Sequence, residues 1–164
     1  MERGRIYELR SIGTIRSPYR AAAGTPIQPT YAQRAAGRVI LDAAFEEALV
    51  DIDGFERIWL IYAFDRAGAF EPRVVPYRDD RPHGLFATRA PNRPNPIGLS
   101  VVRLLGREGR QLRVDGVDVL DGTPLLDLKP YVPEFDAFSE SRAGWLDERR
   151  TDRRLADGRF HDPD

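Results

Sequence analysis

The apolar residues of this chain fall in short runs that are separated by Gly, Pro and polar residues. The run from Arg57 to Phe64 is nearly all apolar and aromatic, which predicts a central strand buried on both faces with Trp59 in the core. The sequence Asp121-Gly122 is the strongest turn signal in the chain. Further segments with the composition of strands cover residues 7–16, 37–41, 85–88, 97–105, 112–120 and 125–131.

Only two segments have a helical pattern. Asp42 is placed to cap a helix over residues 43–50, and a short helix is expected over residues 143–156. The count of roughly seven strands with frequent turns predicts a mainly β protein, a small single-domain β-barrel with one or two short helices and long ordered loops. No Gly-x-Gly-x-x-Gly follows a strand, so a Rossmann fold is not expected. We expect residues 1–138 to form the barrel domain and residues 139–164 a charged C-terminal extension with a short helix.

Composition narrows the classes of site. The chain has no cysteine and two histidines, so neither thiolate chemistry nor a histidine-based metal site is expected. The net charge of −1 gives no global basic field of the kind that marks many nucleic-acid-binding proteins. No apolar run approaches the roughly 20 residues that span a membrane, and the N-terminus has no apolar signal region. We therefore expect a cytoplasmic protein with no membrane contact and no metal.

A proline-rich loop stands between two of the predicted strands. Pro91, Pro94 and Pro96 each fix φ and push the preceding residue out of the helical region, so residues 90–96 form a stiff extended loop. The loop carries polar side chains, and a rigid polar loop held by a scaffold is suited to ligand binding. A purely structural proline-rich turn is the alternative. Gln28, in another Pro-containing loop, is either a ligand amide or a solvated side chain.

Three motifs carry a resemblance to a known family. They are Phe86-Ala87-Thr88-Arg89, then residues 93–100 (Arg-Pro-Asn-Pro-Ile-Gly-Leu-Ser), then residues 121–131 (Asp-Gly-Thr-Pro-Leu-Leu-Asp-Leu-Lys-Pro-Tyr). Together with residues 12–19 and Gln28-Pro29 they closely resemble the TrmO family, also called YaeB-like or VirR-like. The resemblance covers about residues 7 to 146, and its long motifs occur in the family's order.

The resemblance implies a small β-barrel methyltransferase that uses S-adenosylmethionine, with S-adenosylhomocysteine as product. It further implies a homodimer with the cofactor site near the subunit interface, and a tRNA anticodon loop as partner. The family reaction is methylation of the exocyclic amino nitrogen of threonylcarbamoyladenosine beside the anticodon. The cofactor contacts that it implies lie on the motif residues Gln28, Phe86, Ala87, Thr88, Arg89, Asn92, Arg93, Asn95, Pro96, Leu126 and Asp127.

Within these motifs, particular side chains suit particular tasks. Asn92 and Asn95 offer amide contacts to an adenine edge or a carboxylate, and Arg89 or Arg93 can pair with the donor's carboxylate or with an RNA phosphate. A splayed-out base could stack on an aromatic ring such as Phe86, Tyr131 or Phe135, although we expect Phe86 in the core.

The predicted strand over residues 125–131 carries the candidate catalytic group. Its period of two places Asp127, Lys129 and Tyr131 on one face. Asp127 is the candidate general base, and its two neighbours are candidates to orient or polarise the ureido carbonyl. Lys129 is the single lysine among 25 basic residues, which fits a site where a compact ammonium works and a guanidinium does not. The alternative for Asp127 is a strand-end carboxylate paired with an arginine.

Two other functions remain open from the sequence alone. One is a non-catalytic module that binds S-adenosylmethionine and regulates another process. The other is a methyltransferase that acts on a different substrate, which the lack of a strong basic face leaves open.

Overall fold

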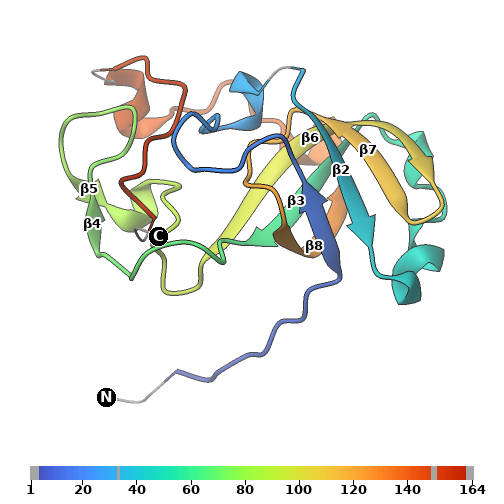
Figure 1. Ribbon diagram of the computed structural model, residues 1–164. Helices are drawn as coiled ribbons and strands as arrows, with labels where there is room; N and C mark the ends of the chain where they lie inside the picture. The colour runs from blue at the N-terminus through green and yellow to red at the C-terminus, as the bar shows by residue number, and fades with distance from the viewer. Residues whose placement is uncertain (1–3, 33, 149–150, 162–164) are drawn as a thin grey trace.

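A closed antiparallel barrel organises the computed structural model, which describes residues 4–32, 34–148 and 151–161. Around the barrel the strand order is β1-β2-β7-β6-β3-β8, and a separate two-stranded sheet pairs β4 with β5 (Figure 1). This confirms the predicted mainly β barrel. The strands are β1 (Gly13–Arg16), β2 (Ala36–Leu41), β3 (Arg57–Ala63), β4 (Arg73–Val74), β5 (His83–Gly84), β6 (Ile97–Glu108), β7 (Gln111–Asp115) and β8 (Thr123–Pro130).

The first and last barrel strands meet to close the barrel. Gly13 of β1 lies opposite Leu41 of β2 on one side and opposite Leu125 of β8 on the other. Closure removes the unpaired edges that an open sheet would expose. The predicted turn at Asp121 and Gly122 leads into β8, and Gly122 adopts φ +84°, a conformation that favours glycine.

The interior of the barrel is filled by alternate residues of each strand. In β3 the inward residues Ile58, Leu60 and Tyr62 are buried, while the residues between them are more accessible. The strand is therefore not buried on both faces, as its composition predicted. Trp59 faces outward, where its ring contacts Tyr131 and its Nε1–H donates to Asp136 Oδ2 at 3.2 Å.

Several predicted element boundaries differ in the structure. Residues 7–12 lie outside β1, because pairing with β2 and β8 begins at Gly13. Residues 85–88 do not form a strand; η4 (Leu85–Ala87) is a 3-10 turn, and the Thr88 hydroxyl donates back to the Leu85 carbonyl at 2.8 Å. The predicted helix after Asp42 is also a 3-10 helix, η2 (Ala43–Leu49), and the Asp42 side chain makes no capping hydrogen bond.

The remaining short helices lie in the loops and the C-terminal region. Instead of the predicted helix over residues 143–156, a 3-10 helix is followed from residue 151 by an irregular segment with two isolated β-bridges. We call residues 151–161 the C-terminal strap. The helices are η1 (Pro29–Tyr31), η3 (Ile52–Gly54), α1 (Pro133–Asp136) and η5 (Gly144–Glu148).

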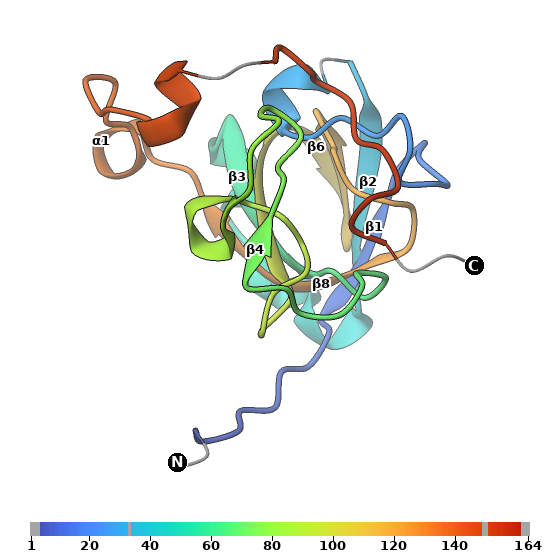
Figure 2. The same cartoon turned by 90° about the vertical axis from the view of Figure 1, so that its left-hand side faces the viewer.

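The strap packs against loops at one end of the barrel. Figure 2 shows β4 and its loops in front of the barrel, with the strap in red running towards the side of β1 and β2. The strap's backbone exchanges hydrogen bonds with residues 24–27, for example Ala156 N to the Thr25 carbonyl at 2.7 Å, and the Phe160 carbonyl accepts from Gly68 N at 3.0 Å. These bonds hold the end of the chain across two loops that are far apart in sequence.

Across the described ranges, helices are short, and none is long and apolar enough to cross a membrane. In the same part of the chain no three His, Asp or Glu side chains are grouped so that they could hold a metal ion.

Candidate functional site

A cavity of about 260 Å³ opens where the end of the barrel meets the loops and the strap. We call it the central cavity. Its volume is close to the lower end of the range of about 300 to 1,000 Å³ that is usual for small-molecule sites. Its walls come from the loop before η1, the C-terminal end of β3, the N-terminal end of β6, the β7–β8 connection, the proline-rich segment and the strap. The residues that line it include Thr25, Ile27, Gln28, Tyr62, Arg66, Thr88, Arg89, Arg93, Leu99, Asp118, Leu120, Thr123, Ala156 and His161.

A buried hydrogen-bonded chain runs along one wall of the central cavity. Ser100 Oγ donates to Asp118 Oδ1 at 2.6 Å and lies 2.9 Å from the Tyr62 hydroxyl. Because the single Ser100 proton goes to the carboxylate, Tyr62 is the donor to Ser100. Gly98 makes room for this arrangement, since a Cβ there would lie 2.3 Å from the Tyr62 ring.

The environment of Asp118 makes its carboxyl unusual. Burial raises the pKa of Asp118 to about 7, while the Ser100 hydrogen bond and the Arg89 charge act in the opposite direction. The same burial, with the nearby Asp118 charge, raises the pKa of Tyr62 well above its usual value. A carboxyl that is costly to ionise and that lines a cavity fits a site for a cationic group.

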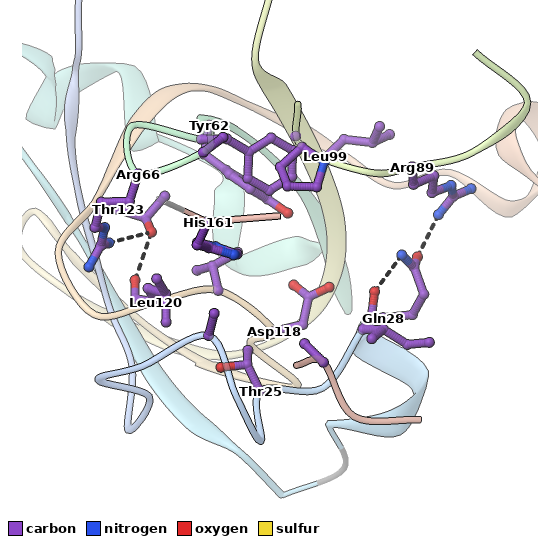
Figure 3. Close-up of a pocket in the computed structure, with 18 of the residues that line it drawn as sticks. Thr25, Gln28, Tyr62, Arg66, Arg89, Leu99, Asp118, Leu120, Thr123 and His161 are labelled. Carbon is purple, nitrogen blue, oxygen red and sulfur yellow. Dashed lines mark hydrogen bonds between the residues drawn. The ribbon is translucent and has the colours of Figure 1, made fainter. Parts of the chain in front are cut away.

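Arginine side chains supply the opposite charge around the same cavity. Arg66 donates to the Thr123 hydroxyl at 3.2 Å, and this bond holds the guanidinium at one edge of the cavity (Figure 3). On the other edge Arg89 donates to Gln28 Oε1 at 2.6 Å. The central cavity therefore presents the half-buried Asp118 carboxyl between the Arg66 and Arg89 guanidinium groups. The exposed Asp65 carboxylate, which also lines the cavity, pairs with Arg66 at 3.4 Å. This arrangement suits a ligand carrying both a positive and a negative group.

The strap completes this cavity. Ala156 and His161 line it from the strap, and His161 lies in the middle of the close-up in Figure 3. Residues nearly at the end of the chain therefore face Tyr62, from the middle of the chain, across one small volume.

The structure separates the residues that the sequence analysis singled out for the cofactor. Those that line the central cavity are Gln28, Thr88, Arg89 and Arg93. Phe86 and Ala87 line a neighbouring cavity instead, and Phe86 is 78% exposed, so the expectation that it lies in the core is wrong. Asn92, Asn95, Pro96, Leu126 and Asp127 line neither cavity.

Asn92 has a visible structural task in the proline-rich loop. It is 3% exposed, and its side-chain amide nitrogen donates to the Ala69 carbonyl at 3.1 Å. Its backbone carbonyl accepts from Glu71 N. These bonds tie the proline-rich loop to residues 69–71. Arg93 acts similarly, because its guanidinium donates to the carbonyls of Thr88 and Ala90 at 3.0 and 3.3 Å.

The candidate catalytic residues lie together, but on the outer wall of the barrel. Lys129 Nζ is 3.1 Å from Asp127 Oδ2, with the two side chains 63% and 48% exposed. Tyr131 contacts Trp59 at the end of the same wall. None of the three lines the central cavity. Lys129 borders a shallow groove, which we call the wall groove, lined by Trp59, Ile61, Leu99, Lys129, Pro130, Val132, Phe135 and Asp136.

Sequence reasoning missed Asp118, Tyr62, Arg66, Thr123 and His161. Asp118 carried one usable signal, since it is a lone carboxylate inside the apolar run of residues 117–120. The others carried none, because only the fold brings β3, the β7–β8 connection and the strap to one place.

Several known proteins are similar to this chain in sequence. The model of the tRNA-methyltransferase O N-terminal domain matches residues 14–137. A probable S-adenosyl-L-methionine-binding protein from Pyrococcus abyssi is 50% identical over 153 residues, covering 92% of this chain and 83% of the relative. The tRNA (adenine(37)-N6)-methyltransferase of Escherichia coli K12 is 33% identical over 149 residues, covering 85% of this chain and 63% of that enzyme.

Solved structures resemble the fold as well. The crystal structure of TrmO from Pseudomonas aeruginosa superposes with a TM-score of 0.75 at 41% identity, covering 87% of this chain and 64% of that one. The chain thus spans less than two thirds of the bacterial proteins that it matches. The resemblance predicted from the sequence motifs is confirmed, and the chain belongs to the TrmO family.

Proposed function

We propose that this protein is an S-adenosylmethionine-dependent methyltransferase that modifies the exocyclic amino nitrogen of threonylcarbamoyladenosine beside the tRNA anticodon. The observation that carries the proposal is the central cavity, where the half-buried Asp118 carboxyl and the guanidinium groups of Arg66 and Arg89 face one small volume. The methyl donor carries a sulfonium, an ammonium and a carboxylate, so the charged side chains of the cavity fit this ligand. The relatives' names, which refer to S-adenosylmethionine binding and to adenine-37 methylation of tRNA, support the same proposal.

Within this proposal, Asp118 holds a cationic group of the donor, and Arg66 or Arg89 holds its carboxylate. When bound, S-adenosylmethionine supplies a methyl group on a sulfonium, and transfer of that methyl to the acceptor nitrogen, with loss of a nitrogen proton, leaves S-adenosylhomocysteine. The protein contributes mainly position. The Tyr62–Ser100–Asp118 chain and the Arg66–Thr123 bond keep polar side chains at fixed places before any ligand arrives.

We further propose a homodimer formed through the wall groove. Leu99 lines both the central cavity and this groove and is 46% exposed, and Phe135 in the groove is 68% exposed. A second copy covering this apolar wall would bury both side chains beside the donor site. It would also bring Asp127, Lys129 and Tyr131 from an open wall into an enclosed site, in which Asp127 is the candidate general base. A Phe135→Glu variant that remains dimeric by sedimentation would contradict this interface.

The activity is tested with purified protein, labelled S-adenosylmethionine and two tRNA preparations, one with and one without the threonylcarbamoyl modification. We expect methylation only of the modified adenosine, identified by mass spectrometry of released nucleosides. Methylation of another nucleoside would establish a different substrate. Donor binding by calorimetry with no methyl transfer to either tRNA would indicate a non-catalytic sensor of S-adenosylmethionine. Because the proposed substrate is a tRNA, we propose a cytoplasmic location.

A further inference from the structure

A second cavity, of about 530 Å³, adjoins the central cavity. We call it the outer cavity. The two share one wall, which includes Ile27, Gln28, Thr88 and Arg89. The hydrogen bond from Arg89 to Gln28 crosses this wall, and the Gln28 amide donates back to the Ile27 carbonyl at 2.6 Å. Ligands in the two cavities would therefore meet at the side chains of Gln28 and Arg89, as the donor and acceptor of a transferred group must.

The outer cavity presents aromatic rings to solvent. Phe86 is 78% exposed, so packing in the core does not account for it. Trp145 is held in place, with its ring stacked on His83 at 4.5 Å and 22° and its Nε1–H bonded to the Ala87 carbonyl at 2.8 Å. Fixed rings of this kind are what unpaired nucleobases stack on, because every base offers a π-face.

Guanidinium groups accompany these rings. Arg93 lies 5.5 Å from the centre of the Phe86 ring. Arg78 and Arg154 each lie 5.4 Å from the centre of the Tyr31 ring, which also lines the outer cavity. Arginine beside an aromatic ring adds cation–π stacking and attracts the phosphate backbone of a single strand. Arg78 also pairs with Asp152 at 3.2 Å, so part of this positive charge is neutralised. The remaining positive charge is local, and a chain with a net charge of −1 gives no sign of it in its composition.

We infer that the outer cavity binds the methyl-accepting nucleobase of a single-stranded RNA loop, with Phe86 and Trp145 as stacking surfaces. The inference rests on the proposed function and extends it by assigning the acceptor site. A base stacked on these rings lies beside the shared wall, against Gln28 and Arg89 and next to the central cavity. Extrusion of a loop base costs little, since it is not paired in a duplex.

The test measures RNA binding directly, without methyl donor. A labelled RNA stem-loop with an adenosine in its loop is titrated with protein, and fluorescence anisotropy reports the affinity. We expect Phe86→Ala and Trp145→Ala each to lower the affinity about tenfold. Phe86→Tyr, which keeps the ring, should bind within about twofold of the wild type. Phe138→Ala is the matched control, because Phe138 is 73% exposed and lines neither the central cavity, the outer cavity nor the wall groove.

A second measurement separates stacking from loss of structure. The chain has two tryptophans, so a Trp59→Phe variant reports on Trp145 alone, and the inference requires that stem-loop RNA quench this fluorescence. Calorimetric affinity for S-adenosylmethionine should remain unchanged in Phe86→Ala and Trp145→Ala, which also shows that both variants are folded.

The outcomes for this site and for the proposed function are distinct. Wild-type affinity for RNA in both folded alanine variants, absence of stem-loop binding by the wild type, or an unquenched Trp145 would each overturn the acceptor-site assignment, even if tRNA is methylated. Failure of the proposed function would instead appear as a wild-type protein that does not methylate tRNA, whether or not it binds the donor.

Discussion

Two carboxylates of this protein, Asp118 in the central cavity and Asp127 on the outer wall, differ in exposure and in hydrogen-bond partner. Asp118 accepts a hydrogen bond from Ser100 and is surrounded by the barrel end, loops and strap, and burial raises its pKa to about 7. Asp127 is 48% exposed and pairs with Lys129 in solvent. The sequence motif that draws attention contains Asp127, whereas the fold builds its perturbed site around Asp118. Perturbed groups in clefts are the better indicators of a ligand site.

The largest effect should separate the two carboxylates by donor affinity. We expect Asp118→Asn to weaken S-adenosylmethionine binding about a hundredfold at pH 8, because a charge-assisted contact in a buried site is lost. Asp127→Asn should leave that affinity within about twofold and lower turnover instead. Calorimetry and steady-state kinetics on both variants provide the measurement. Equal losses of donor affinity in the two variants would remove the distinction.

The next largest effect concerns stability, to which the Asp118 carboxyl should contribute in a pH-dependent way. The folded-state pKa of Asp118, about 7, lies above the value of 3.8 for an unperturbed Asp. The native state therefore holds the proton more tightly, and stability falls as pH rises from about 4 to 7 and then levels off. Asp118→Asn removes this cost, so it should raise the free energy of unfolding by up to about 4 kcal/mol at pH 8 and change it little below pH 4. Urea unfolding at the two pH values checks the sign, and a variant that is less stable at pH 8 would contradict it.

The pH dependence of donor binding is a smaller effect of the same origin. A cationic ligand needs Asp118 ionised, and the ionised fraction rises about tenfold between pH 6 and 8 for a pKa near 7. Asp118 interacts electrostatically with three charged or titratable groups, namely Arg89, Tyr62 and Tyr19. We expect the wild-type affinity to rise about tenfold over this range and the Asp118→Asn affinity to stay flat. A flat wild-type profile would show that Asp118 does not face the donor's positive charge.

The smallest effect concerns the outer wall. The Asp127–Lys129 pair is solvent-exposed, and such pairs contribute about 0 to 1 kcal/mol. Lys129→Gln should therefore change the free energy of unfolding by less than about 0.5 kcal/mol. Arg113→Gln is a suitable control, because it removes another cation from a pair in which both side chains are exposed. A large loss of stability from Lys129→Gln would mean that its role is structural. Loss of turnover at unchanged stability would support a role in the site shared by two copies.

The barrel was predictable from the sequence because local patterns determine it. Short segments with the composition of strands, separated by turn residues, identify β2, β6 and β8, and Gly122 marks the turn before β8. Trp59 misled the prediction, because a half-covered outer wall has the same apolar composition as a core. Phe86 misled it in the opposite sense, because nothing in its neighbours shows that a 3-10 turn presents the ring to solvent.

The central cavity was largely unpredictable, for a physical reason. Gln28, Arg89 and Arg93 were identified because they belong to recognisable motifs. Asp118 and His161 were not, because their meeting depends on a barrel closed between β1 and β8 and on a strap that docks across distant loops. Contacts between residues this far apart in sequence leave no periodic signal.

The position of the strap has a consequence for the order in which the protein assembles during synthesis. Every barrel strand lies within the first 130 residues, whereas the wall of the central cavity needs residues 154–161. At a translation rate of about 5 to 20 residues per second, the barrel strands are complete a second or more before the cavity can close. During synthesis the protein therefore has its scaffold before it has its binding site, so a nascent chain can fold without yet competing for ligand.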